Sequence, residues 1–281
     1  MLRKIPVSQL ENQLYKLIIK ATYDLPKNTL KSISASLKNE TKPLAKQILR
    51  EILDNARIAK QKKMPLCQDT GLALILIEIG QDVHITGGDL EKSLQQTVAK
   101  AYKDLYLRKS VVNDPLQRKN TGTNTPAMIY THIVPGSKIK ITFLPKGGGS
   151  ENCSALRMLK PSDGLPGVEK FILDTVRSAE ANPCPPIIVG VGLGGNFDMA
   201  AYLAKKAIIR PLGKKNPKTQ YQELENNLLA KINELGIGPM GLGGKTTALA
   251  VHIETLPCHI AALPVAVNIQ CHSNRAASVT I

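Results

Sequence analysis

Three of the five cysteines in this chain lie far apart in the sequence, each in a short segment rich in proline or polar residues: Cys67, Cys184 and Cys271. Three thiolates that converge from distant loops can hold a four-iron, four-sulfur cluster and leave one iron without a protein ligand. Such an iron acts as a Lewis acid rather than as an electron carrier. A lone cysteine is most often a small buried apolar residue, which is the prediction for Cys153 and Cys258. The spacing by itself leaves open whether the other three share a site.

The composition indicates a soluble globular protein that can bury a full core. The chain has 281 residues, of which 43% are apolar and 21% are charged, and its formal net charge is +15. Lys and Arg are scattered along amphipathic segments and Trp is absent, which disfavours stacking on nucleic-acid bases. An anionic small substrate, an acidic partner subunit or a lysine-rich proteome each explains the charge. We therefore expect no nucleic acid as a partner.

Nothing in the sequence indicates secretion or membrane insertion. The first residues lack the apolar core of a signal peptide, and no stretch approaches the roughly twenty apolar residues that a membrane span needs. An odd number of cysteines also argues against a secreted disulfide framework. We expect the protein in the reducing cytoplasm, without membrane association.

The elements that must position these cysteines are predicted to form one domain over residues 1–281, of the α/β (mixed α+β) class. Residues 1–62 predict a helical N-terminal cap, whose first helix begins with a capping box formed by Ser8 and Glu11. Residues 63–281 predict a compact unit with a mixed sheet, and this part contains all five cysteines.

A buried strand is predicted from Gly71 to Gly80, which places Cys67 on the loop that enters it. Two apolar segments at 127–134 and 138–144 flank a Pro-Gly pair and predict a β-hairpin. Further helices and strands are predicted over 89–108, 167–180, 187–191, 197–209, 220–235, 246–253 and 265–270.

The segment Gly190–Gly195 matches the dinucleotide-binding pattern G-x-G-x-x-G and follows an apolar strand. A dinucleotide site also needs an acidic residue about twenty positions later, and residues 209–215 contain none. A nucleotide-binding oxidoreductase is kept as an alternative. On the other interpretation, the glycines allow the backbone to approach something closely, whether a cluster, a carboxylate or a neighbouring strand.

Five short strings carry a resemblance to a known family: Cys67-Gln68-Asp69-Thr70-Gly71, Thr121-Gly122-Thr123-Asn124, Lys146-Gly147-Gly148-Gly149-Ser150, Cys184-Pro185-Pro186 and Cys271-His272-Ser273-Asn274-Arg275. The chain resembles the iron–sulfur hydro-lyases of the class I fumarase and tartrate dehydratase family, specifically their α subunit or N-terminal region. The resemblance implies that Cys67, Cys184 and Cys271 hold a four-iron, four-sulfur cluster. The open iron would bind a small dicarboxylic acid and polarise its hydroxyl without net redox change.

The resemblance also implies roles for residues around the cluster. Gln68 and Asp69 match residues that touch substrate, with Asp69 placed to orient the hydroxyl or move its proton; a turn-stabilising carboxylate is the alternative. Arg108 matches an arginine that grips a substrate carboxylate, although its position alone predicts a solvated cation at a helix end. Gly149 falls where the backbone amide contacts substrate. His259 aligns with a histidine near the cluster, as a proton relay or a supporting residue.

Single-chain members of the family carry a further C-terminal domain, whereas this sequence stops at Ile281, soon after the third cysteine of the set. We therefore expect the α subunit of a two-subunit enzyme, assembled with a β subunit as an α2β2 heterotetramer. The expected reaction is the interconversion of fumarate and (S)-malate. The alternative within the family is a tartrate dehydratase, which forms oxaloacetate from tartrate.

Overall fold

The computed structural model describes residues 2–281, which form two compact units. Unit 1 comprises residues 2–25, 56–148 and 275–281, and unit 2 comprises residues 26–55 and 149–274. The helical cap predicted over residues 1–62 is present and consists of three helices. Helix α1 (Val7–Tyr23) belongs to unit 1, α2 (Lys27–Asn39) belongs to unit 2, and α3 (Pro43–Lys62) belongs partly to each. The mixed α/β class is confirmed, and the assignment of residues 1–281 to one domain stays a prediction.

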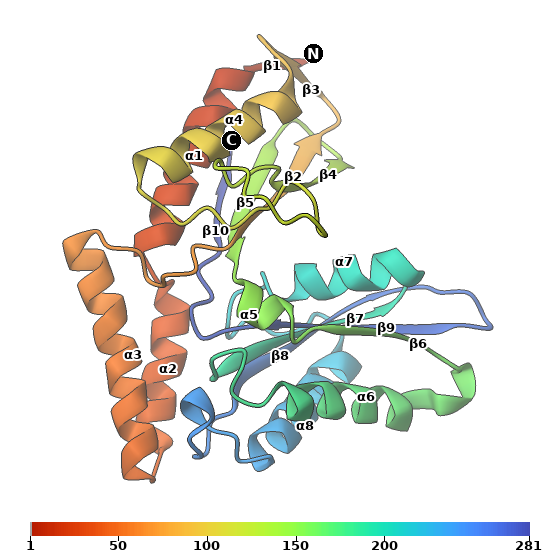
Figure 1. Cartoon of the computed structure of the whole chain (residues 1–281). Helices are drawn as coiled ribbons and strands as arrows, with labels where there is room; N and C mark the ends of the chain where they lie inside the picture. The colour runs from red at the N-terminus through yellow and green to blue at the C-terminus, as the bar shows by residue number, and fades with distance from the viewer. Residues whose placement is uncertain (1) are drawn as a thin grey trace. The chain divides into compact units, whose positions relative to one another are not determined.

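Unit 1 is built on a four-stranded sheet with the strand order β10-β5-β2-β4. Helices α1 and α4 lie together against this sheet (Figure 1), and apolar residues of both helices form the core with the central strands. A short parallel pair of strands, β1 and β3, lies near the start of α1. The elements not yet located are β1 (Arg3–Pro6), β2 (Leu72–Gly80), β3 (Val83–Thr86), α4 (Leu90–Asp104), β4 (Met128–Val134), β5 (Ile139–Lys146) and β10 (Ala277–Thr280).

Strand β2 lies at the centre of this sheet, and this corrects the predicted hairpin. The strands β4 and β5 do not pair with each other; β4 pairs with β2 in parallel and β5 pairs with β2 antiparallel. Five consecutive residues of β2, from Ala73 to Ile77, are buried, so both faces of the strand are covered. A strand that is apolar on both faces is most stable between two others, because no exposed edge remains.

The start of the first helix also differs from the prediction. Helix α1 begins at Val7, with Pro6 at the N-cap position and no capping hydrogen bond from a side chain. The capping box of Ser8 and Glu11 is therefore wrong. The helix is stabilised by its buried face instead, where Leu10, Leu14 and Ile18 are fully buried at helical spacing.

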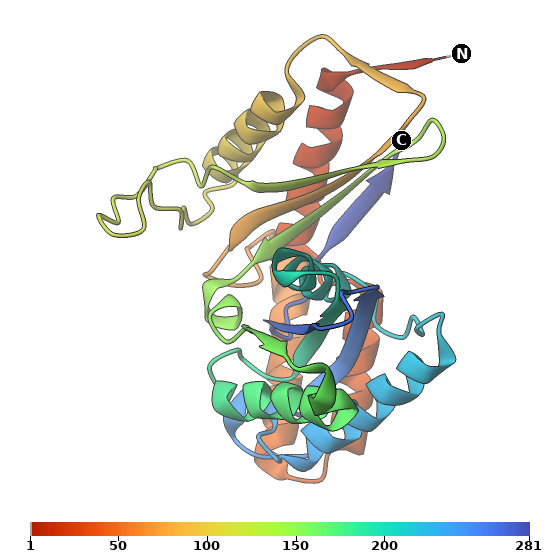
Figure 2. The same cartoon turned by 90° about the vertical axis from the view of Figure 1, so that its right-hand side faces the viewer.

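Unit 2 is a three-layer arrangement around a four-stranded sheet with the strand order β6-β9-β7-β8. Helix α7 covers one face, and α6 and α8 lie side by side on the other, as both views show (Figures 1 and 2). The single helical turn α5 (Gly148–Glu151) precedes β6. The other elements are β6 (Ala155–Leu159), α6 (Gly164–Ala179), β7 (Ile187–Gly194), α7 (Phe197–Ala207), α8 (Thr219–Glu234), β8 (Ala248–Leu256) and β9 (Leu263–Gln270), with single 3-10 turns at Pro161–Asp163 and Pro239–Gly241.

The glycines of the Gly190–Gly195 segment are used for packing. A Cβ added to Gly190 would lie 2.4 Å from the carbonyl oxygen of Ala204, and one added to Gly192 would lie 2.0 Å from that of Ala200. Both oxygens belong to α7, so the glycines let this helix lie directly on β7. The interpretation as a close backbone approach is confirmed.

Every helix and strand predicted beyond residue 63 is present, with ends that differ by a few residues. The short strands β1, β3, β6 and β10 and the turn α5 were not predicted, because four or five residues give little periodic signal. Within residues 2–281, none of the helices is both long and apolar enough to cross a membrane.

Candidate functional site

The loop from Cys67 to Gly71 connects α3 to β2 in unit 1 and carries three of the predicted site residues. Cys67 and Asp69 are half-buried, whereas Gln68 is exposed. The loop enters β2, an inner strand of the sheet with five consecutive buried residues, so its end is fixed by the core of the unit.

Asp69 is held by backbone groups on both sides of its carboxylate. Its Oδ1 accepts a 2.9 Å hydrogen bond from the amide of Gly71, and its Oδ2 accepts one of 2.8 Å from the amide of Gly148. The first bond closes a turn, so the turn-stabilising role considered for Asp69 is present. The second bond ties the loop to the glycine-rich segment after β5. The carboxylate therefore has a fixed orientation, and its contact with substrate stays a prediction.

Groups from elsewhere in unit 1, among them Asn124 of another family string, hold the rest of this loop. Tyr102 donates to the carbonyl oxygens of Thr70 and Gly71, at 2.9 and 3.1 Å, and Asn124 donates to Gly71 O at 3.1 Å. The hydroxyl of Thr70 donates to the carbonyl of Arg108 at 2.9 Å. Burial raises the pKa of Tyr102, which keeps its phenol protonated as a donor. Together with Gly148, these contacts explain why strings distant in sequence belong to one pattern.

Arg275 is a buried cation of the same site that sequence reasoning missed. Its side chain is 5% exposed, and its Nη2 donates a 2.9 Å hydrogen bond to the carbonyl oxygen of Asp69. Its Nε has no hydrogen-bond partner among residues 2–281. Arg275 lines a small hollow together with Cys67, Thr70 and Tyr102. A buried guanidinium with an open donor near a cysteine fits an anionic group bound there.

Arg108 follows α4, with its side chain exposed. Its backbone has a structural role, because its carbonyl oxygen accepts the hydrogen bond from Thr70. The exposed guanidinium agrees with the solvated cation that its position predicted. Its grip on a substrate carboxylate stays a prediction.

Two of the three cysteines lie together in unit 2. Cys184 stands in the loop between α6 and β7, and Cys271 follows β9 directly. The Nδ1 of His272 lies 2.9 Å from the carbonyl oxygen of Cys184, so the two segments touch. Cys184 has a φ of +55°, a conformation that residues other than glycine rarely adopt. His272 is a second site residue without an assigned role in the sequence patterns, although it follows Cys271 directly.

Gly149 lies against the same cysteine loop, whereas His259 does not. A Cβ added to Gly149 would lie 3.3 Å from the carbonyl oxygen of Asn182, two residues before Cys184. His259 is exposed on the connection between β8 and β9, where its Nδ1 accepts a 3.1 Å hydrogen bond from Ala261.

The strand β9 separates His259 from Cys271. Its eight residues span about 26 Å when extended, with His259 before the strand and Cys271 after it. Within unit 2, His259 and Cys271 therefore lie at opposite ends of β9. The role of His259 near a cluster stays a prediction.

The donor atoms suit an iron–sulfur cluster in their chemistry. Among residues 2–281, Cys67, Cys184 and Cys271 are half-buried and form no disulfide, and each lies on a loop beside a strand end. Over residues 2–281 no three His, Cys, Asp or Glu side chains converge on one metal-ion position, and Cys67 belongs to unit 1 while the other two belong to unit 2. The three-cysteine ligand set therefore stays a prediction. Cys153 is half-buried and Cys258 is exposed on the connection between β8 and β9, so the prediction of a buried apolar residue is wrong for Cys258. The Sγ atoms of Cys153 and Cys258 lie 3.3 Å from the carbonyl oxygens of Gly149 and Ala262, respectively.

Comparison with known proteins identifies the family. The sequence model described as "Fumarate hydratase (Fumerase)" matches residues 11–280. A protein of Methanocaldococcus jannaschii named "Putative L(+)-tartrate dehydratase subunit alpha" is 42% identical over 268 residues, which cover 93% of this chain and 94% of the relative. The L(+)-tartrate dehydratase subunits alpha of Escherichia coli K12 and Shigella sonnei are each 34% identical over 245 residues, or 86% of this chain and 80% of theirs. The chain belongs to the iron–sulfur hydro-lyase family of class I fumarate hydratases and tartrate dehydratase α subunits.

Proposed function

We propose that this chain is the α subunit of a two-subunit hydro-lyase that reversibly hydrates fumarate to (S)-malate. The observation that carries the proposal is the fixed Cys67–Gly71 loop, in which the Asp69 carboxylate is oriented by the amides of Gly71 and Gly148. Hydration of an alkene needs a carboxylate or other group held beside the hydroxyl that forms or leaves.

The cluster is part of this proposal. Cys67, Cys184 and Cys271 would hold it, and an iron without a protein ligand supplies a Lewis acid that polarises a hydroxyl. The family match and the half-buried positions of the three thiols support this set. The buried Arg275, with an open donor at Nε, supports an anionic group beside Cys67.

The chain's own groups would bind the substrate and move the proton. Asp69 would orient the hydroxyl of malate and take or give its proton. The exposed Gln68 amide and the Arg108 guanidinium would bind carboxylate oxygens, and the Gly149 amide would add a hydrogen bond at a position where a side chain would crowd Asn182. The base at carbon would come from a β subunit, in an α2β2 assembly in the reducing cytoplasm. The names of the relatives, which are alpha subunits, support a second subunit.

Tartrate dehydration to oxaloacetate is the second candidate. It is favoured by the names of the relatives, which are those of tartrate dehydratase subunits. Tartrate differs from malate by a second hydroxyl, so the same polarised carbon–oxygen bond would break.

The test is co-expression with a β-type partner, followed by anaerobic purification and assays with fumarate, malate, tartrate and mesaconate. We expect a brown complex with about four irons per α chain. Replacing Cys67, Cys184 or Cys271 by Ala should abolish colour and activity, while Cys153→Ala should keep both. Turnover of tartrate alone would select the second candidate. A colourless complex that binds NAD with one site per chain would overturn the hydro-lyase proposal.

A further inference from the structure

The helical turn that contains Gly149 is not stable on its own. Helix α5 has only four residues, and the segment Gly147–Gly149 has no side chains. A single helical turn is unstable in isolation, and glycine has the largest backbone freedom in the unfolded chain. Neighbouring groups must therefore fix the position of the Gly149 amide.

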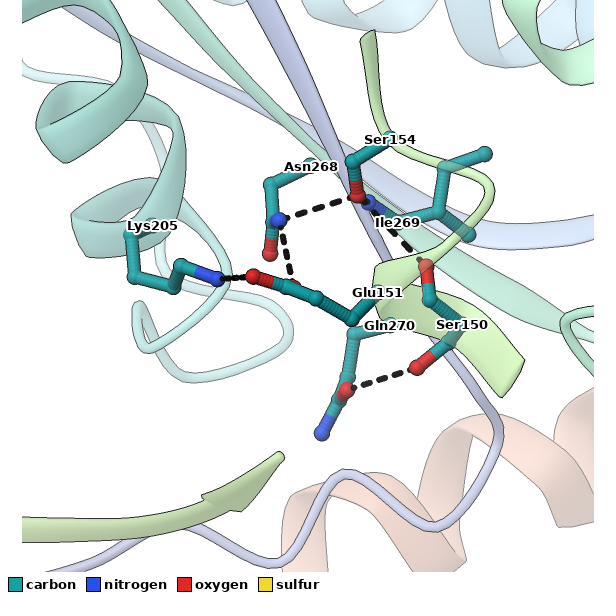
Figure 3. A network of polar contacts seen from close by, with 7 residues as sticks. All are labelled: Ser150, Glu151, Ser154, Lys205, Asn268, Ile269 and Gln270. Carbon is teal, nitrogen blue, oxygen red and sulfur yellow. Dashed lines mark hydrogen bonds and ion pairs between the residues drawn. The ribbon is translucent and has the colours of Figure 1, made fainter. Parts of the chain in front are cut away.

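A network of polar side chains in unit 2 performs this task from the other end of the turn (Figure 3). The carboxylate of Glu151 forms an ion pair with Lys205 of α7 through Oε1 and accepts a 2.8 Å hydrogen bond from Asn268 of β9 through Oε2. The Asn268 amide also donates to Ser154 Oγ at 2.9 Å. The hydroxyl of Ser154 in turn accepts a 3.2 Å hydrogen bond from the amide of Ile269. The turn is thus bonded to both a helix and a strand.

Burial makes this network stronger than a surface pair. The side chain of Lys205 is 13% exposed and that of Glu151 is 36% exposed, while Asn268 is buried. An ammonium that is largely removed from water depends on its counter-ion far more than an exposed lysine does. Loss of the Glu151 charge would leave the Lys205 ammonium group poorly solvated. The Lys205 side chain would then have to move.

The network also connects the turn to the strand that leads to a cysteine. Asn268 and Gln270 lie on the same face of β9, two residues apart, and Gln270 accepts a 3.4 Å hydrogen bond from Ser150. Cys271 follows Gln270 directly. The same short stretch of β9 therefore sets the positions of the Gly149 turn and of Cys271.

We propose that Glu151 is a positioning residue for substrate binding: paired with Lys205 and Asn268, it holds the Gly149 amide where a substrate carboxylate binds. This rests on the proposed function, in which that amide contacts the dicarboxylate. Glu151 does not touch the substrate itself. Its loss should therefore weaken binding and leave the chemical step and the cluster almost unchanged.

The test uses Glu151→Gln in the co-expressed complex. Gln keeps an acceptor for Asn268 but removes the charge beside Lys205. The KM for the dicarboxylate should rise about tenfold, with kcat within about threefold and iron content unchanged. Glu151→Asp, which keeps the charge, should recover part of the loss. Lys205→Met should raise KM similarly, and the double variant should be no worse than either single one, because both act through one interaction.

Amide hydrogen exchange supplies a readout that does not need turnover. Exchange over residues 147–154 should be faster in Glu151→Gln, and exchange over β7 should be unchanged. The matched control is Glu169→Gln, which breaks the 2.8 Å pair of Glu169 with Lys231 elsewhere in unit 2 and should leave KM and this exchange as they are.

Two results would overturn the proposal. One is a KM within twofold of the wild type together with unchanged exchange in the turn. The other is a parallel fall in kcat and iron content, which would mean that Glu151 serves cluster binding or folding. A wild-type complex that turns over no dicarboxylate would instead reject the proposed function, and the exchange comparison would still decide whether Glu151 orders the turn.

Discussion

The Arg275 guanidinium donates a 2.9 Å hydrogen bond to the carbonyl oxygen of Asp69, a residue 206 positions earlier in the sequence. This bond joins the last family string to the first within unit 1. It also places a buried positive charge next to the loop that carries Cys67 and Asp69. The contact gives Arg275 a function that its place in the sequence pattern did not reveal.

Replacing Arg275 by Lys should damage the site although the charge is kept. Lysine lacks the planar set of donors that reaches Asp69 O and leaves Nε free for another acceptor. We expect a loss of about 1–3 kcal/mol in the free energy of unfolding, measured with denaturant, and at least a tenfold loss of activity in the assembled complex. Arg177→Lys, which changes an exposed pair with Asp174, should cost less than about 0.5 kcal/mol. Equal stability of the two variants would contradict the role of Arg275.

Asp69→Asn should reduce activity much more than an equivalent change elsewhere. The amide group of asparagine cannot accept at both positions, so the bond from Gly71 or from Gly148 is lost. We expect a decrease in kcat of at least about 100-fold if Asp69 also moves the proton. Asp114 is the matched control, because its carboxylate also accepts two backbone amides, from Leu116 and Gln117. Asp114→Asn should lower stability slightly and keep kcat.

Tyr102→Phe should destabilise unit 1 by about 1–3 kcal/mol, because the carbonyl oxygens of Thr70 and Gly71 lose the Tyr102 hydroxyl, although Gly71 O keeps the hydrogen bond from Asn124. The pH dependence follows from the raised pKa of Tyr102, whose main cause is burial. The folded state favours the protonated phenol of Tyr102. Its contribution to the free energy of unfolding is therefore complete below the ordinary pKa of about 10 and is lost as the pH rises further. Between pH 8 and 11, the free energy of unfolding should therefore fall more steeply for the wild type than for Tyr102→Phe. Tyr106→Phe, at a 93% exposed tyrosine, should behave as the wild type.

His252 should make unit 2 sensitive to acid. Burial, followed by the charge of Arg210, lowers the pKa of His252 to about 4 from 6.5. The folded state favours the neutral ring of His252. The contribution of this ring to the free energy of unfolding is therefore present above pH 6.5 and is lost as the pH falls toward 4. The loss amounts to about 3 kcal/mol at most.

His252→Gln tests this assignment, since Gln keeps a donor for the carbonyl of Ala207. Its unfolding free energy should fall less than that of the wild type between pH 6.5 and 4. His84→Gln changes an exposed histidine and should leave the pH profile of the wild type intact. Parallel profiles for all three proteins would show that another group is responsible.

The sequence allowed the elements to be predicted, but not all of their partners. The buried run of β2 and the apolar segments of β4 and β5 are visible as local patterns. Nothing local shows that β2 lies between the other two, because pairing depends on contacts between residues more than fifty positions apart. For the same reason the hairpin was a reasonable prediction and a wrong one.

In the candidate site as well, the sequence allowed some residues to be identified but not the contacts between them. The loop of Asp69 and the segment of Gly149 were identified from short strings, and the structure supplies the contacts that hold them. Arg275 and His272 had no individual signal beyond membership in a string. A strand of eight residues lies between His259 and Cys271, a distance that a sequence motif does not express.

Unit 1 is assembled from three separate stretches of the chain, and the last of them is residues 275–281. Strand β10 pairs with β5, and Arg3 donates to the carbonyl of Ile281 at 3.2 Å. During synthesis the Cys67 loop therefore waits for its buried arginine until residue 275 has been added to the chain. Residues 149–274 are complete in the growing chain before then. A nascent chain halted before residue 275 would expose an unfinished Cys67 loop to solvent and oxidants.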